Sequence, residues 1–130
     1  MHIYIPLHAK YSYEQSKEFA RLIVTMVQKE LPRVTSIERA VSSRKGKIYL
    51  DFLQNRPQAT LATVYSVRPK PGATVSMPLE WDEVKKGLKM ADYHLKNVVP
   101  ILKERGDIFK GVLGKGIDML AAIRKLETMM

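Results

Sequence analysis

The chain has 130 residues, no cysteine, and 22 Lys and Arg against 13 Asp and Glu, which gives a net charge of +9. This length predicts one domain with a hydrophobic core, and the lack of cysteine excludes disulfides and thiolate metal sites. The charge favours a polyanionic partner over a membrane surface, although a generally basic soluble protein can carry the same charge. We expect a cytoplasmic protein without a secretory signal or a membrane-spanning helix.

The N-terminal part of the chain predicts a strand followed by a long helix. Residues 2–7 are rich in β-branched and aromatic side chains and alternate in polarity, which is typical of a strand. Ser12 and Gln15 have the spacing of a capping box, so a helix should begin at residue 13. Its apolar stripe continues to Leu31, and Pro32 should end it.

The next segment predicts a short helix and then a strand with an acid at its centre. Thr35 and Glu38 form a second capping-box pattern, and the helix after it should end near Ser42. Residues 47–54 alternate with the period of a strand, and Asp51 lies in the middle. Desolvating a carboxylate costs free energy unless cations or donors compensate it. Asp51 is therefore either an outward-facing residue on a solvated face or a charge held by a cation.

Basic residues are concentrated around Asp51, between residues 39 and 70. They are Arg39, Arg44, Lys45, Lys47, Arg56, Arg68 and Lys70. Such a cluster is the pattern expected for a surface that binds phosphates.

The C-terminal half predicts irregular segments, one short strand and several helices. Residues 60–67 are ambiguous between strand and helix, 68–73 are irregular because they hold two prolines and a glycine, and 74–79 read as a strand. A short turn at 81–86 leads to a helix with Pro100 in its first turn. Gly106 should close that helix, and Asp107 should cap the next turn. A final amphipathic helix is predicted over 117–129, with Met119, Leu120, Ile123 and Leu126 on one side.

These elements predict an α+β fold with an antiparallel sheet and flanking helices. The strands are residues 2–7, 47–54 and 74–79, and the helix at 13–31 should pack on one sheet face and leave the Asp51 side open.

Three linked motifs support a family resemblance: YLDFLQN at 49–55, YSVRPKPGA at 65–73 and VSMPLEWDE at 75–83. In this order they resemble the polymerase domain of bacterial DNA ligase D, a member of the archaeo-eukaryotic primase superfamily. HIYIPL at 2–7 and RGDIF at 105–109 are also similar, so the resemblance covers most of the chain.

The resemblance implies the C-terminal half of a primase-polymerase fold. The whole chain, 1–130, would be one domain, with 1–84 as part of the catalytic core and 85–130 as its helical C-terminal part. It also implies a nucleotidyltransferase that uses Mg²⁺ or Mn²⁺ and a nucleoside triphosphate to extend DNA ends in non-homologous end joining. Its partners would be DNA ends and an attached or separate ligase domain, in the cytoplasm of a bacterium or archaeon.

Five residues match positions to which the resemblance assigns roles. Asp51 matches the third catalytic, metal-binding aspartate, and His2 matches the last residue of a Ser-Gly-x-x-Gly-x-His motif that contacts the nucleotide triphosphate. Arg68 and Arg44 match basic contacts of the phosphates. Lys70 lies where the family usually has a basic residue, and a solvated lysine is an equal alternative. Trp81 is interpreted as anchoring its loop to the core rather than stacking on a base.

The chain departs from the family pattern in one respect that matters for activity. The Asp-x-Asp pair of the family occurs nowhere in the sequence. We therefore expect a domain cut inside its nucleotide-binding motif, and no polymerase activity from this chain alone. The alternatives are a non-catalytic module that binds nucleic acid or a partner, and a folded fragment with no role of its own.

Overall fold

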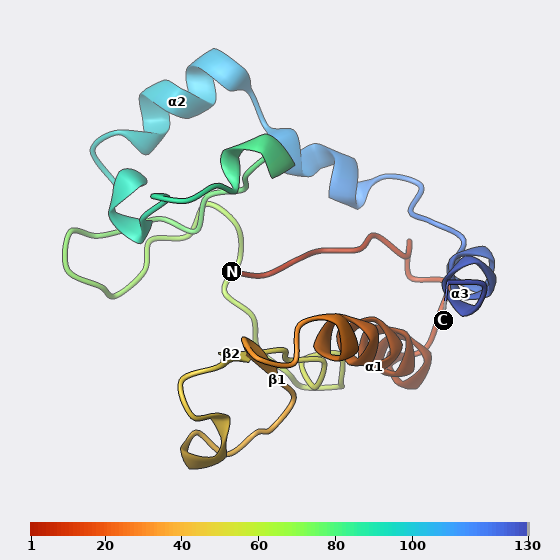
Figure 1. The fold of residues 1–130 in the computed structure, drawn as a ribbon. Coiled ribbons are helices and arrows are strands. Elements are labelled where there is room, and N and C mark those ends of the chain that lie inside the picture. Colours follow the sequence, from red (N-terminus) through yellow and green to blue (C-terminus); the bar gives the residue numbers. More distant parts are fainter. Residues whose placement is uncertain (130) are drawn as a thin grey trace. The chain divides into compact units, whose positions relative to one another are not determined.

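The computed structural model describes residues 1–129, which form two compact units (Figure 1). Unit 1 consists of residues 1–4 and 61–114, and unit 2 consists of residues 5–60 with the C-terminal segment from Lys115. Unit 2 contains helices α1 (Tyr13–Glu30) and α3 (Met119–Glu127) and strands β1 (Thr35–Ser36) and β2 (Ile48–Tyr49). Unit 1 contains helix α2 (Val98–Arg105) and several 3₁₀ turns. Both helices and strands are present, in agreement with a mixed α+β architecture.

Helix α1 begins and ends where the sequence predicts. The Ser12 side chain accepts a hydrogen bond from the Gln15 amide at 3.2 Å, and the Gln15 side chain accepts one from the Ser12 amide at 2.8 Å. This reciprocal pair satisfies two amides that have no partner within the helix. The Leu31 amide donates to the Val27 carbonyl in the last turn, just before Pro32. The capping box and the helix are therefore confirmed.

The predicted antiparallel sheet is wrong, because β1 and β2 run parallel. The Ile48 amide donates to the Val34 carbonyl at 2.8 Å, and the Leu50 amide donates to the Ser36 carbonyl at 2.9 Å. A 3₁₀ turn at Ser42–Arg44 and left-handed backbone at Lys45 and Gly46 (φ of 48° and 78°) lie within the connection.

The predicted helix after Thr35 is also absent, because Thr35 belongs to β1. Its hydroxyl donates to the Leu31 carbonyl at 2.7 Å, instead of capping a new helix. Thr35 and Ser36 are both buried. Backbone pairing with the segment around Ile48 thus prevails over the local capping pattern, as tertiary context often does.

The other two predicted strands form no sheet within residues 1–129. Residues 2–7 are extended without a ladder partner, and Val75 and Thr74 make only isolated antiparallel bridges, to Val67 and His94. The strand predicted over 47–54 is shorter than expected, because a side-chain turn follows β2. The Asp51 carboxylate accepts a hydrogen bond from the Leu53 amide at 2.9 Å, which ends the extended run.

The helices of the C-terminal half start and stop close to their predicted positions. Pro100 lies in the first turn of α2, and Gly106 closes that helix with a φ of 74°. The Asp107 side chain caps the 3₁₀ turn Ile108–Leu113 by accepting from the Phe109 amide. The Asp118 side chain caps α3 by accepting from the Ala121 amide. No helix within residues 1–129 is both long and apolar enough to cross a membrane.

The buried apolar core of the described residues is small. It consists of Phe19 and Met119 in unit 2 and Val75 and Val98 in unit 1. Trp81 is 71% exposed, so the prediction that it anchors its loop to the core is wrong. Leu120, which was expected on the apolar side of α3, is 56% exposed.

One ion pair in unit 1 connects the 78–83 loop to α2. The Arg105 guanidinium lies 2.8 Å from the Glu83 carboxylate and also donates to the Pro78 carbonyl. The Tyr93 hydroxyl donates to the same Glu83 oxygen at 3.2 Å. Burial alone would raise the pKa of Glu83, but hydrogen bonds from the Glu80 amide and from Arg105 outweigh it and lower the pKa. Glu83 is therefore ionised and paired at neutral pH.

Replacing this carboxylate is expected to destabilise unit 1 in a pH-dependent way. Glu83→Gln should reduce the free energy of unfolding by about 1–3 kcal/mol at neutral pH, since it weakens hydrogen bonds to a charged group. Because the folded-state pKa lies below its usual value of 4.5, the contribution is complete above that pH and is lost as the pH falls through the folded pKa. Urea unfolding at several pH values measures the difference.

Glu18→Gln is the matched control. Glu18 pairs with Arg21 on α1, where both side chains are more than half exposed, so its loss should change stability little. Equal effects of the two substitutions would contradict a special role of the Glu83–Arg105 pair.

Candidate functional site

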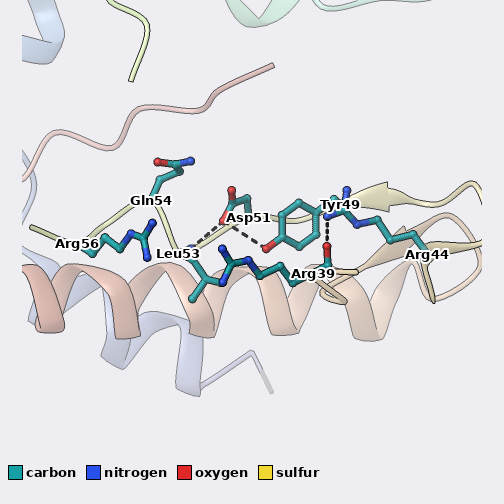
Figure 2. A pocket seen from close by; sticks show the side chains of 7 residues that line it. All are labelled: Arg39, Arg44, Tyr49, Asp51, Leu53, Gln54 and Arg56. Atoms are coloured by element: carbon teal, nitrogen blue, oxygen red, sulfur yellow. Dashed lines mark hydrogen bonds between the residues drawn. The ribbon is translucent and has the colours of Figure 1, made fainter. Parts of the chain in front are cut away.

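The candidate site is a hollow of about 220 Å³ in unit 2 that contains Asp51 (Figure 2). It is built from the segment before β2 and the segment after it. The residues that line it are Arg39, Arg44, Tyr49, Asp51, Leu53, Gln54 and Arg56. Figure 2 shows Tyr49 and Arg44 on one side of Asp51, and Gln54 and Arg56 on the other. One carboxylate thus lies among three guanidinium groups.

Asp51 lies two residues after the end of β2 and is exposed, although the sheet face on which it was predicted to lie does not form. One of its carboxylate oxygens accepts the Leu53 amide at 2.9 Å and lies 3.5 Å from the Tyr49 hydroxyl. The first contact fixes the direction of the carboxylate, while the second is at the outer limit for a hydrogen bond. The prediction that Asp51 lies in the middle of a strand is therefore wrong: Asp51 follows β2, and the turn after the strand orients it.

Arg44 is held in place from three directions. Its Nε donates to the Glu38 carbonyl at 2.9 Å, and one Nη donates to the Arg39 carbonyl. The guanidinium carbon lies 3.9 Å from the centre of the Tyr49 ring, the geometry of a cation–π contact. A guanidinium has five N–H donors, so these two hydrogen bonds leave donors for a ligand. Arg44 is consequently a preorganised cation at the edge of the hollow.

Tyr49 connects Arg44 to Asp51. Partial burial of its hydroxyl, followed by the nearby Asp51 carboxylate, raises the pKa of Tyr49 above its ordinary value. The phenol therefore stays protonated at neutral pH and serves as a hydrogen-bond donor.

The chemistry of the lining favours an anion. Three guanidinium groups against one carboxylate leave an excess of positive charge, and guanidinium donors match the oxygens of phosphate. A pair of divalent cations needs several oxygen ligands, but no group of three or more potential metal ligands occurs within residues 1–129. The described residues therefore do not fit a two-metal site by themselves, and Asp51 offers a single carboxylate.

The remaining predicted site residues belong to unit 1. His2 makes an edge-on contact with the Tyr4 ring, with centroids 6.5 Å apart. Arg68 and Lys70 belong to one turn, in which the Lys70 amide donates to the Arg68 carbonyl and the Arg68 amide donates to the Thr74 carbonyl, both at 2.7 Å. The structure thus groups Asp51 with Arg44 in unit 2, and places His2, Arg68 and Lys70 in unit 1.

Sequence reasoning assigned no individual site role to five of the seven lining residues, although Arg39 and Arg56 belong to the basic cluster that was expected to bind phosphates. Gln54 and Arg56 lie close to Asp51 along the chain, so their proximity was a usable signal. Arg39 reaches the hollow only because the chain turns back at Lys45 and Gly46, which no local pattern reveals. The role of Tyr49 as the bridge between Arg44 and Asp51 likewise depends on the fold.

Comparison with known proteins gives a consistent match. A family model described as "LigD, primase-polymerase domain" matches residues 1–109. "Bifunctional non-homologous end joining protein LigD" of Bacillus subtilis (strain 168) is 33% identical over 80% of this chain and 17% of that protein. "Multifunctional non-homologous end joining protein LigD" of Mycolicibacterium smegmatis is 30% identical over 83% of this chain and 14% of that protein. The Pseudomonas aeruginosa protein of the same description is 32% identical over 65% of this chain and 10% of its own length.

Proposed function

The chain belongs to the LigD primase-polymerase domain family, and on this basis we propose that it is part of a module that transfers nucleotides to DNA ends in non-homologous end joining. It spans less than a fifth of the length of the curated relatives that it matches. The observation that carries the proposal is the hollow in unit 2, where Asp51 lies among three arginines. Such a lining suits a nucleoside triphosphate beside a carboxylate.

The proposed site residues divide into phosphate-binding residues and one metal-binding carboxylate. Arg44 binds phosphate oxygens of the nucleotide with the donors that its backbone contacts leave over. Asp51 is proposed to contribute one carboxylate to a Mg²⁺ or Mn²⁺ site, and residues 1–129 contain no cluster of further ligands around it. His2, Arg68 and Lys70, which belong to unit 1, are proposed as further residues that bind nucleotide phosphates, as the resemblance implies.

This proposal implies partners and a location. The partners are DNA ends, a nucleoside triphosphate and a ligase domain, either on the same polypeptide or separate. The printed names of the relatives refer to non-homologous end joining, which is the process that the proposal carries over to this chain. We place the protein in the cytoplasm of a bacterium or archaeon.

Nucleotide binding tests the role of the hollow. Arg44→Ala should weaken ATP binding by about tenfold or more, because it removes a charge-assisted contact worth about 1.5–3 kcal/mol. Isothermal titration of the 130-residue chain with ATP measures this loss.

Arg33→Ala is the matched control, because Arg33 is an exposed arginine of unit 2 outside the hollow. Both substitutions remove one positive charge, so they change the overall charge equally. Arg33→Ala should nevertheless leave the affinity for ATP nearly unchanged, because Arg33 does not line the hollow. Equal losses from the two variants would show that only the overall positive charge attracts ATP. Absence of ATP binding by the parent chain would contradict the proposed function.

The alternative function is a non-catalytic module that binds nucleic acid. The net charge of +9 favours it, and fluorescence anisotropy with labelled DNA tests it. If three phosphates are neutralised, raising the salt from about 50 to 200 mM should weaken binding about 40-fold, because condensed counterions are released. A chain that binds DNA in this way but does not bind ATP would favour the alternative. A chain without DNA binding at low salt would contradict it.

A further inference from the structure

Two contacts in unit 1 connect His2 to the segment that follows α2. The rings of His2 and Tyr4 meet edge-on, with centroids 6.5 Å apart and an angle of 83°. The ring of Tyr4 in turn meets that of Phe109 edge-on, at 5.1 Å and 89°. Edge-to-face pairs have a preferred geometry, so each ring restricts the orientation of the next. The orientation of His2 therefore depends on the position of Phe109.

A second set of contacts connects the Arg68 segment to the same place. The Tyr65 hydroxyl donates to the Asp107 carboxylate at 2.5 Å, and the same oxygen accepts the Phe109 amide at 3.0 Å. Tyr65 has a φ of 61°, a left-handed conformation that is rare for a bulky residue and needs support from its surroundings. Its amide is held by the Ser76 carbonyl at 2.8 Å.

The support at Tyr65 extends along the chain to Arg68. The Ser76 amide donates to the Ser66 carbonyl at 3.0 Å, and the Arg68 amide donates to the Thr74 carbonyl at 2.7 Å. These bonds tie the backbone on both sides of Val67 to residues 74–76. A shift of Tyr65 therefore displaces the segment that carries Arg68.

We propose that residues 107–109 form a positioning turn, which holds His2 and Arg68 in a fixed relation for binding a triphosphate. Asp107 and Phe109 touch no nucleotide in this proposal and act only through the residues that they hold. The proposal rests on the proposed function, in which His2 and Arg68 contact the triphosphate. Two ligand-binding groups that are already ordered lose less freedom on binding, so the turn raises the affinity without making a new contact.

A merely structural role is a weaker explanation of these contacts. The Tyr65–Asp107 hydrogen bond is exposed, and Asp107 itself is exposed, so the pair shields little surface from water. Asp107 also serves two donors with one oxygen, although a cap requires only the Phe109 amide. The second donor, Tyr65, is the one that leads to Arg68.

Tyr65→Phe tests the positioning turn, because it removes only the hydroxyl that contacts Asp107. Two readouts apply: the imidazole NMR signals of His2 without nucleotide, and the dissociation constant for ATP from isothermal titration. We expect the His2 signals to shift and the dissociation constant to rise about tenfold, as expected when ordered side chains are freed. The signals of His8, which belongs to unit 2, should stay in place.

Two further substitutions give a rescue comparison. Asp107→Ala removes the shared oxygen and should reproduce the shift of the His2 signals. Asp107→Asn keeps an oxygen acceptor for both donors and should stay close to the parent protein. Tyr13→Phe is the control for the tyrosine, because Tyr13 is 57% exposed and belongs to unit 2.

The two readouts separate the two proposals. Unchanged His2 signals in both Tyr65→Phe and Asp107→Ala would overturn the positioning turn, whatever the affinity for ATP. Shifted signals with unchanged ATP affinity would also overturn it, since the turn would then have no effect on binding. A parent chain that binds no ATP would instead overturn the proposed function, while a shift of the His2 signals would still establish the coupling through residues 107–109.

Discussion

The 130-residue chain alone is expected to add no nucleotide to a primed DNA end, even with Mn²⁺ at high concentration. Asp51 is the one carboxylate in its hollow, and the other charged groups there are guanidiniums, which repel cations. A divalent ion needs about six oxygen ligands, and two ions need carboxylates that bridge or surround them. Residues 1–129 contain no cluster that supplies these ligands.

Extension should appear when the Asp-x-Asp pair that the resemblance implies is supplied. The test adds to this chain the polypeptide segment of the Bacillus subtilis relative that precedes its matching region, and follows primer extension on a gel. In the extended protein, Asp51→Asn should reduce the rate more than about 100-fold, because loss of a direct metal ligand should exceed the 10–100-fold effect of residues that only support one.

Asp82→Asn is the matched control, since Asp82 is an exposed aspartate of unit 1. It should leave extension unchanged. Extension by the unmodified 130-residue chain would contradict the assignment, and so would full activity of the Asp51→Asn variant of the extended protein.

Phe19→Ala should be the most destabilising single substitution in unit 2. Phe19 is 5% exposed on α1, and among the described residues of this unit only Met119 is also a buried apolar side chain. Truncating a buried phenylalanine costs about 3–5 kcal/mol, since it removes apolar contacts and leaves a cavity. That loss is comparable to the whole stability of many small domains. Urea unfolding followed by far-ultraviolet circular dichroism measures it through the helical signal.

Leu120→Ala provides the comparison, because Leu120 is a helical residue of the same unit that is 56% exposed. Its truncation should change the free energy of unfolding by about 0.5 kcal/mol or less. If both variants lost the same stability, the small core around Phe19 would not be what holds unit 2 together.

Elements that depend on local contacts were predictable from sequence. The capping box of Ser12 and Gln15, the glycine stop at Gly106 and the Asp107 cap each involve residues a few positions apart. In each of these signals the interacting residues lie within a few positions of each other, so the local sequence is enough to identify both partners.

Elements that depend on distant partners were not predictable in the same way. Residues 2–7 have the composition of a strand, but a strand needs a neighbour to satisfy its backbone groups, and the pattern does not identify one. Thr35 has an equally good local alternative as a helix cap, and pairing with Ile48 decides against it. The parallel direction of that pair depends on the path of the eleven-residue connection between Ser36 and Ile48, which has no regular pattern in the sequence.

The candidate site was predictable only where its residues belong to a recognisable motif. Asp51 and Arg44 were identified through motif resemblance, and the structure places both at one hollow. The contribution of Arg39 and the contact between Arg44 and Tyr49 depend on how the chain turns before β2. The exposure of Trp81 was mispredicted, because an aromatic residue in a loop has no periodic pattern that indicates its burial.

The extended segment at residues 2–7 has a consequence for handling the protein in solution. Ile3 is 62% and Ile5 39% exposed, and their backbone has no ladder partner within residues 1–129. Such a segment favours pairing between molecules, as an uncovered sheet edge does, while the net charge of +9 keeps molecules apart. At 0.1 M salt the range of that repulsion shrinks to about 10 Å. We therefore expect colloidal stability to fall as the ionic strength rises, and concentrated samples to stay dispersed longest in dilute buffer.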